Sequence, residues 1–159
     1  MATRTIAKMC RYDSNSNLME YPEAASQSFK IGELVYLNTS GQVTVCAANA
    51  QVILGLAVED ATGTTNTMIV VDILKPGEWV IANLYNDTAA SAVCANTAFG
   101  DLAELATSSN KTVIDITATA SACFRIVNRL ADESATDIYP RVIAAVISTY
   151  LQCDIATVS

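Results

Sequence analysis

Apolar and polar residues alternate over short stretches from Phe29 onward, in the pattern of β-strands. Runs rich in Val, Ile, Leu and Tyr recur at a spacing of about 8–12 residues, and Gly, Pro, Asn, Ser or Thr separate them. This pattern predicts an all-β fold. The expected strands are 33–37, 43–45, 52–58, 68–74, 78–84, 102–106, 112–117, 122–127 and 141–151.

Three local signals refine this prediction. Gly55 lies inside an apolar run, which indicates a bulge or a close backbone approach where a strand bends around a small barrel. Lys75-Pro76-Gly77 is a strong turn signal and predicts a hairpin between the strands on either side of it. The last run, 141–151, could also be a buried helix, although the preceding Pro140 and the Val and Ile residues of the run favour a strand. Residues 132–137 are expected to form a polar loop or a short helical turn.

Residues 31–40 (IGELVYLNTS) and 99–108 (FGDLAELATS) share an order of features. Each has a glycine, an acid, alternating apolar residues and a polar turn, followed by a β-branched strand. We interpret them as a pseudo-repeat of one β-hairpin element, with chance similarity in an Ala/Thr-rich chain as the alternative.

The first 28 residues show no sustained period of 2 or 3.6. Their apolar residues are spaced singly, so the segment cannot bury enough surface to fold by itself. Two interpretations remain open, a disordered leader and an arm that orders on a partner. We therefore divide the chain into an N-terminal arm, 1–28, and a β-rich body, 29–159.

The charge is low and unevenly distributed. Charged residues make up only 16% of the chain, which suggests that a partner covers part of the surface. Arg4, Lys8 and Arg11 precede the first acid, Asp13, so the first twelve residues carry +3. The remainder holds six bases against sixteen acids, and such an acidic body disfavours nucleic-acid binding.

The five cysteines are far apart in the sequence and form no CxxC pair, so they match neither a disulfide framework nor a zinc site. Most have apolar neighbours, and we expect small buried hydrophobic residues in a reducing cytoplasm. Cys10, beside Arg11, is expected to be an exposed, inert thiol. No secretory signal or membrane-spanning run is visible, which predicts a soluble protein.

Little in the sequence indicates catalysis. The chain has no histidine, which removes the usual general base and every His-containing triad or metal site. Phosphate-binding glycine motifs and calcium loops are absent, so no cofactor is expected. The adjacent acids Glu59-Asp60 and Asp132-Glu133 are interpreted as solvated loop residues. We expect a binding or structural protein and not an enzyme.

Two alternatives belong to other functional classes. Phe29, Tyr36 and Trp79 are more often core residues in strands, but Trp79 and nearby tyrosines could bind a small ligand or a carbohydrate. A carboxylate-dependent hydrolase would have to use Glu59, Asp60 or Glu78.

One segment resembles a known family. Residues 29–45 read FKIGELVYLNTSGQVTV, 53–63 read ILGLAVEDATG, and 75–80 read KPGEWV. These stretches are similar to the head decoration, or cement, proteins of tailed phages, in which an "LVYL" strand, a Ser-Gly turn, an "ILGVAL"-like strand and a "PGE" turn follow one another. The resemblance covers about a third of the chain, and 83–159 lies outside it.

The resemblance implies a small β-barrel or β-tulip-like domain with an extended N-terminal arm. It also implies homotrimers on the outer surface of the virion capsid, after synthesis in the host cytoplasm. The arm would bind the major capsid protein by adding a strand to a sheet edge, and its positive charge would suit acidic patches. The residues expected to touch the capsid are Arg4, Ile6, Lys8, Met9, Arg11 and Tyr12.

Overall fold

The computed structural model describes residues 2–13, 15–96, 99–117 and 119–152. Within these ranges the chain forms strands and short 3-10 helices, with no α-helix, so the all-β prediction is confirmed. The strands are β1 (Cys10–Arg11), β2 (Leu18–Pro22), β3 (Leu34–Leu37), β4 (Val43–Val45), β5 (Gly55–Ala57), β6 (Met68–Ile73), β7 (Trp79–Tyr85), β8 (Leu102–Thr107), β9 (Thr112–Asp115), β10 (Phe124–Arg129) and β11 (Arg141–Val146).

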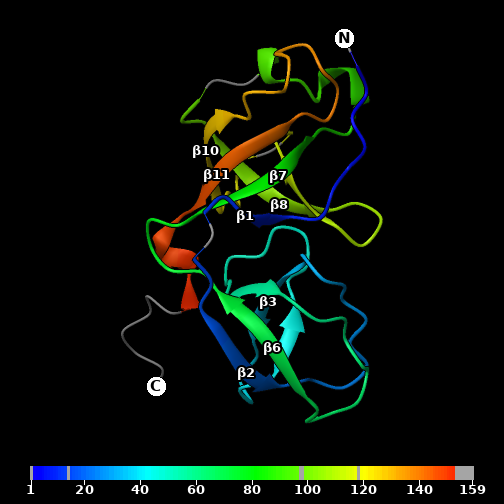
Figure 1. Cartoon of the computed structure of the whole chain (residues 1–159), viewed down its shortest axis with the longest axis vertical. Helices are drawn as coiled ribbons and strands as arrows, with labels where there is room; N and C mark the ends of the chain where they lie inside the picture. Colours follow the sequence, from blue (N-terminus) through cyan, green and yellow to red (C-terminus); the bar gives the residue numbers. More distant parts are fainter. Residues whose placement is uncertain (1, 14, 97–98, 118, 153–159) are drawn as a thin grey trace.

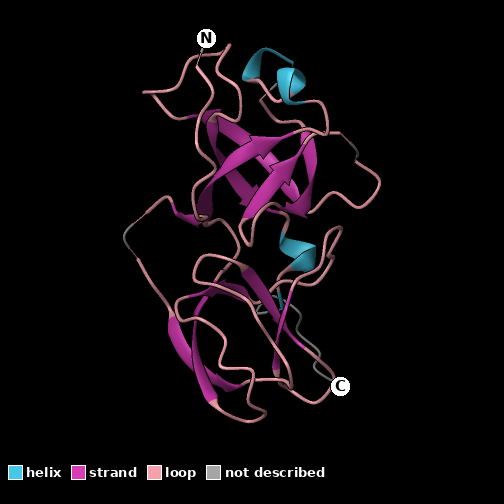
Figure 2. Ribbon diagram, turned by 90° about the vertical axis from the view of Figure 1, so that its right-hand side faces the viewer, coloured by secondary structure: helices cyan, strands magenta, loops and turns pink. Residues whose placement is uncertain are grey.

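Five strands close into a barrel in the order β7-β11-β10-β8-β9. Most neighbours are antiparallel, and a parallel pairing of Leu84 with Ile114 joins β9 back to β7. β1 pairs with the other half of the same β7 edge, where Cys10 lies opposite Ile81. This barrel forms the upper half of the molecule in Figure 1, and its crossing strands are visible in Figure 2.

A second antiparallel sheet, in the order β2-β6-β5-β3-β4, forms the lower half of the molecule. Its two edge strands approach each other at one end, where Glu23 forms a parallel bridge with Val43 and the N–H of Ala24 donates to the Val43 carbonyl. At the other end, no bridge joins β2 to β3 or β4 among the described residues. The second sheet is therefore a half-closed barrel with an open mouth.

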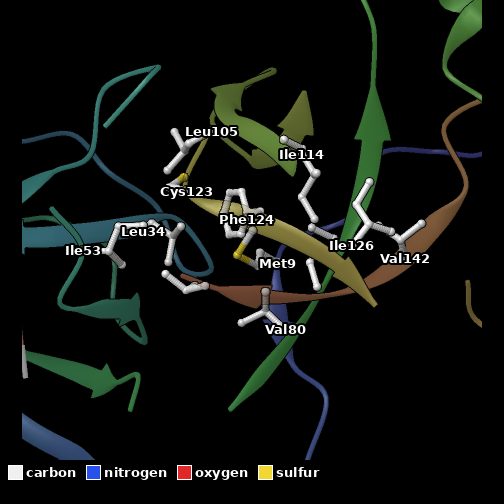
Figure 3. Close-up of a cluster of buried hydrophobic side chains, with 14 of the residues drawn as sticks. Met9, Leu34, Ile53, Val80, Leu105, Ile114, Cys123, Phe124, Ile126 and Val142 are labelled. Carbon is white, nitrogen blue, oxygen red and sulfur yellow. The ribbon is translucent and has the colours of Figure 1, made fainter. Parts of the chain in front are cut away.

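One hydrophobic core fills the barrel and continues into the contact between the two sheets. Phe124 and Ile126 point inward from β10 and belong to one buried cluster with Val142 of the adjacent strand β11 and Val80 of β7 (Figure 3). Leu34, from the second sheet, belongs to the same buried cluster. A smaller core lies inside the second sheet itself. The shared cluster explains why the two sheets pack together, since separating them would expose apolar surface to water.

The N-terminal segment is extended, as expected, but it is not free of the body. It crosses the barrel as β1 and then becomes β2, an edge strand of the second sheet (Figure 1). Near its start, Thr3 bridges Ile138. Met9 is only 2% exposed and lies in the main core. The division at residue 28 therefore does not separate an independent arm from a body in the described residues.

The hairpin predicted across Lys75-Pro76-Gly77 is wrong. β6 and β7 are both present where expected, but β6 pairs with β2 and β5, whereas β7 pairs with β1, β9 and β11. The turn carries the chain from the second sheet to the barrel. Both edges of each strand are already used by other partners, so β6 and β7 have no free edges with which to pair.

The pseudo-repeat is confirmed as a repeated hairpin element. β3 pairs with β4 and β8 pairs with β9, each antiparallel, in different sheets. Gly32 and Gly100 precede the first strand of each hairpin and both have positive φ, at 87° and 98°. Such a backbone suits glycine, because other residues are strained there. The shared glycine therefore marks the same backbone turn in both copies.

The last segment is a strand, as favoured, but only as far as Val146. A 3-10 turn, Ser148–Tyr150, follows it, and Leu151 then forms an isolated parallel bridge with Ile53, just before β5. Residues 132–137 form turns, within the two options expected for them. The segment after β11 thus reaches from the barrel to the residue that lies two positions before β5, which ties the two halves together.

The close backbone approach expected at Gly55 is confirmed. A Cβ placed on Gly55 would lie 2.0 Å from the Asp72 carbonyl oxygen of β6. We predict that Gly55→Ala forces β5 and β6 apart and lowers the free energy of unfolding by about 2 kcal/mol or more, measured by urea unfolding.

Gly41→Ala is the matched control for that change. Gly41 has φ of 72° and no atom within 4 Å of a built Cβ. It should cost only the left-handed backbone strain of about 1 kcal/mol. An equal loss in the two variants would contradict the packing explanation.

Candidate binding surface

Arg11 turns inward at the junction of the two sheets, with its side chain only 6% exposed. Its Nε donates to Asp72 Oδ2 of β6 at 2.8 Å, and its Nη1 lies 2.9 Å from Glu78 Oε2, just before β7. Its Nη2 donates to the carbonyl of Ile73. One guanidinium thus joins β1, β6 and the start of β7, so Arg11 is occupied within the molecule.

Arg4 is also paired internally. Its Nη2 lies 2.8 Å from Asp137 Oδ2 and its Nε lies 2.8 Å from Glu133 Oε2. On the other side, Arg141 contacts Glu133 at 2.7 Å and Asp132 at 2.6 Å. The Glu133 side chain is fully buried, so this acid is not the solvated loop residue that was predicted, whereas Asp132 is exposed.

Four of the six expected contact residues remain near the surface, and one of them is Arg4, whose side chain is 37% exposed. Ile6 is half-buried, and its carbonyl accepts a hydrogen bond from Lys111 at 2.6 Å. Lys8 is exposed, and Tyr12 is 49% exposed. Of the three cations that gave the segment its charge of +3, Arg4 and Arg11 are matched by nearby acids. The segment therefore does not present a basic surface of that strength.

Tyr12 begins a row of residues across the outside of the barrel, which we call the outer row. Its N–H donates to the Trp79 carbonyl, and the two rings lie 5.6 Å apart. Trp79 lies opposite Ala145, Ala145 opposite Arg125, and Arg125 opposite Leu102. Directly opposed residues in a sheet share a face. The outer row thus runs over β7, β11, β10 and β8.

Apart from Arg125, the outer row is apolar, and most of its side chains are accessible. Trp79 and Leu102 are each 37% exposed, and Arg125 donates to the Gly100 carbonyl, in the turn before β8. The prediction that Trp79 is a core residue is therefore wrong, whereas Phe29 is buried as expected. Sequence alone could not align these residues, because they come from four strands whose register was unknown. Aromatic side chains with one arginine and few other charges are typical of protein interfaces.

Two of the three carboxylates proposed for a hydrolase, Asp60 and Glu78, are engaged in local structure. Asp60 accepts from the N–H of Ile31 at 3.0 Å and from Lys30 at 3.1 Å, and these two interactions lower its pKa. Such a carboxyl stays ionised and is a poor general acid. Glu78 pairs with Arg11, and Glu59 is exposed.

Buried acids also anchor loops. Glu23 is fully buried and accepts from the N–H groups of Thr62 and Gly63 at 3.0 and 2.7 Å. Glu104 accepts from the N–H of Ser121 at 2.8 Å. These buried carboxylates accept hydrogen bonds from loop backbone groups and so hold the loops against the sheets. No local sequence pattern predicts these contacts, because 39 residues separate Glu23 from Thr62 and 17 separate Glu104 from Ser121.

The cysteines largely match the expectation. Cys46, Cys94 and Cys123 are buried, and Cys10 is exposed. Burial raises the pKa of all three buried thiols, to about 11 for Cys94 and about 12 for Cys123. They are therefore protonated at neutral pH and weak nucleophiles. Cys153 lies outside the described residues.

Comparisons with protein-family models and with curated proteins find no match for this chain. Across the described ranges, no group of three or more potential ligands is placed to hold a metal ion. Over the same part of the chain, no helix has the length and apolar character needed to cross a membrane.

We predict that Arg11→Met lowers the free energy of unfolding by about 3 kcal/mol, because it leaves Asp72 and Glu78 without their buried partner. Lys8→Met is the matched control, since Lys8 is exposed and the change should stay within about 0.5 kcal/mol. Chemical denaturation measures both. Similar small effects would mean that Arg11 does not hold the sheets together.

We predict that the free energy of unfolding depends on the ionisation of Asp137 at acidic pH. Hydrogen bonds from the N–H groups of Ala2 and Ser134, with Arg4, lower its pKa to about 2. The folded state therefore prefers the ionised form, which stabilises the protein above about pH 4, and this contribution is lost as the pH falls toward 2. Melting temperatures should show the gap between wild type and Asp137→Asn narrowing over that window.

Asp87→Asn, at an exposed position, serves as the control for the acid experiment. Its melting profile should follow that of the wild type at every pH. A gap between wild type and Asp137→Asn that stays constant down to pH 2 would contradict the assignment.

Proposed function

We propose that this protein is a non-enzymatic capsid decoration protein, which binds the outer surface of a phage head and bridges subunits of the major capsid protein. The observation that carries the proposal is the outer row, an exposed apolar surface aligned across four strands. The resemblance of residues 29–45, 53–63 and 75–80 to head decoration proteins supports the same function.

The N-terminal segment contributes to this surface in a revised way. Tyr12 belongs to the outer row, and Lys8 and Ile6 lie on the same segment near the surface. Arg4, Met9 and Arg11 act indirectly, because their contacts fix the segment on the barrel. Capsid contact by the segment thus uses its outward-facing side chains.

A rigid body suits a cement role. A protein that contacts two neighbouring subunits raises the free energy needed to separate them only if its own structure does not yield first. The shared core and the Arg11 contacts join the barrel to the second sheet. We propose that the protein acts as a homotrimer on the virion, because several weak contacts in one assembly bind together more tightly than one.

A second function is favoured by the ring contact of Tyr12 and Trp79. Two exposed aromatic rings 5.6 Å apart can form an apolar platform for a sugar or another small ligand. A saturable shift in tryptophan fluorescence with glycans would favour this alternative, and the single Trp79 makes the signal easy to assign.

Binding to heads that lack this protein tests the main proposal. We predict that the double variant Tyr12→Ser, Trp79→Ser loses affinity by about tenfold or more, since aromatic anchors carry much of the energy at interfaces. Ile31→Ser, at a residue 41% exposed in the second-sheet half, should bind normally. Co-sedimentation measures binding, and heating measures protection of the heads.

Circular dichroism should confirm that both variants remain folded. Failure of the wild-type protein to bind any expanded head, or unchanged binding by the double variant, would contradict the proposal.

A further inference from the structure

The open mouth of the second sheet forms an apolar groove of about 710 Å³. Its volume is in the range of ligand-binding sites in proteins. β2 borders one side, and the turn after β3 borders the other. The apolar side chains that line it are Leu18, Met19, Tyr21, Leu37, Leu54 and Ile73.

Two of these apolar residues are unusually accessible. Leu18 is 57% exposed and Met19 is 54% exposed, although both belong to a strand. Large apolar side chains gathered around a groove leave a surface that gains free energy when it is covered.

The free edge of β2 also faces away from its only strand neighbour. The carbonyl of Asn17 accepts from Ile73, and the N–H of Glu23 donates to Thr67, so alternate residues of β2 bond to β6. Because of this alternation, the N–H and C=O groups of Leu18 and Glu20 point away from β6, along the other edge of β2. Within the described chain, no backbone partner is recorded for them on that side.

The groove has one charged residue, Lys75, among the described residues that line it. Its Nζ donates to Asn17 Oδ1 at 2.9 Å, which holds the ammonium in place without neutralising it. The nearby Glu78 carboxylate accepts from Asn17 and from the backbone of Lys75 and pairs with Arg11. Lys75 forms no ion pair in the described ranges, so its charge is available to an anionic group.

We propose that this groove binds an extended peptide segment of a partner protein as an additional strand on β2, with a carboxylate of that peptide at Lys75. The unpaired edge supplies backbone hydrogen bonds, the apolar lining accepts alternate side chains, and the ammonium sets the position of the acid. An alkyl chain with an acidic head would match the lining and the charge, but it would leave the strand edge unpaired. The inference uses the second sheet alone and does not depend on the outer row.

A synthetic strand provides the probe. We expect the fluorescein-labelled peptide Val-Thr-Val-Thr-Val-Thr-Asp to bind saturably to the full-length protein, measured by fluorescence anisotropy. Lys75→Glu should weaken binding by about tenfold, because attraction becomes repulsion. Lys8→Glu makes the same charge change at an exposed position on the barrel half and should leave binding unchanged. The same peptide ending in Lys should prefer the Lys75→Glu variant.

Backbone pairing needs its own readout. Leu18→Pro removes an outward N–H without removing a bond to β6, so it should abolish most peptide binding. Should that variant fail to fold, the wild-type protein still answers the question, because exchange of the Leu18 and Glu20 amide hydrogens should slow when peptide binds. A peptide with alternate N-methylated amides should not bind.

Three results would overturn the inference. They are an absence of saturable peptide binding, equal affinity for Lys75→Glu and wild type, and saturable binding of decanoate without binding of the peptide. The last would make the groove a site for small amphiphiles. None of them affects head binding through the outer row, so the two proposals can fail separately.

Discussion

The arrangement of the two sheets depends on the ion pairs that the Arg11 guanidinium forms with Asp72 and Glu78. The guanidinium is buried at the junction of the sheets and contacts a carboxylate of β6 and another just before β7. A buried charge is tolerated only when partners surround it, so the three groups require one another. Because β1 carries Arg11, pairing of β1 with the barrel positions the cation for the second sheet. The N-terminal segment thereby becomes part of the structure that it crosses.

The same use of charge recurs throughout the protein. Glu23, Glu104 and Asp137 are buried and accept hydrogen bonds from loop or terminal backbone groups. A net charge of −7 therefore describes the composition more than the surface. Six of the sixteen acids are buried and do not add to the charge of the surface, where the outer row and the groove are exposed. An acidic protein can in this way present surfaces that bind mainly by apolar contact and backbone pairing.

Features of the fold that arise from residues close together in the sequence could be predicted, whereas pairings between strands far apart in the sequence could not. Strands from Phe29 onward were predictable, because alternation and turn residues are local properties. β1 and β2 were missed, since β1 is two residues long and both rely on edges supplied by residues far along the chain. The turn at Lys75-Pro76-Gly77 was visible, but a turn does not specify which sheet receives the next strand. The outer row needed the register of four strands, which no local pattern contains.

The docked N-terminal segment changes how a cement function would work. A disordered arm must lose conformational entropy when it binds, and that loss subtracts from its affinity. Here the loss occurs on folding, where Met9 and Arg11 contribute burial and ion pairs in return. Tyr12 is then held beside Trp79 before any partner arrives. A preorganised surface of this kind needs fewer contacts for a given affinity. This suits a small protein in which only 16% of the residues are charged and can attract a partner electrostatically.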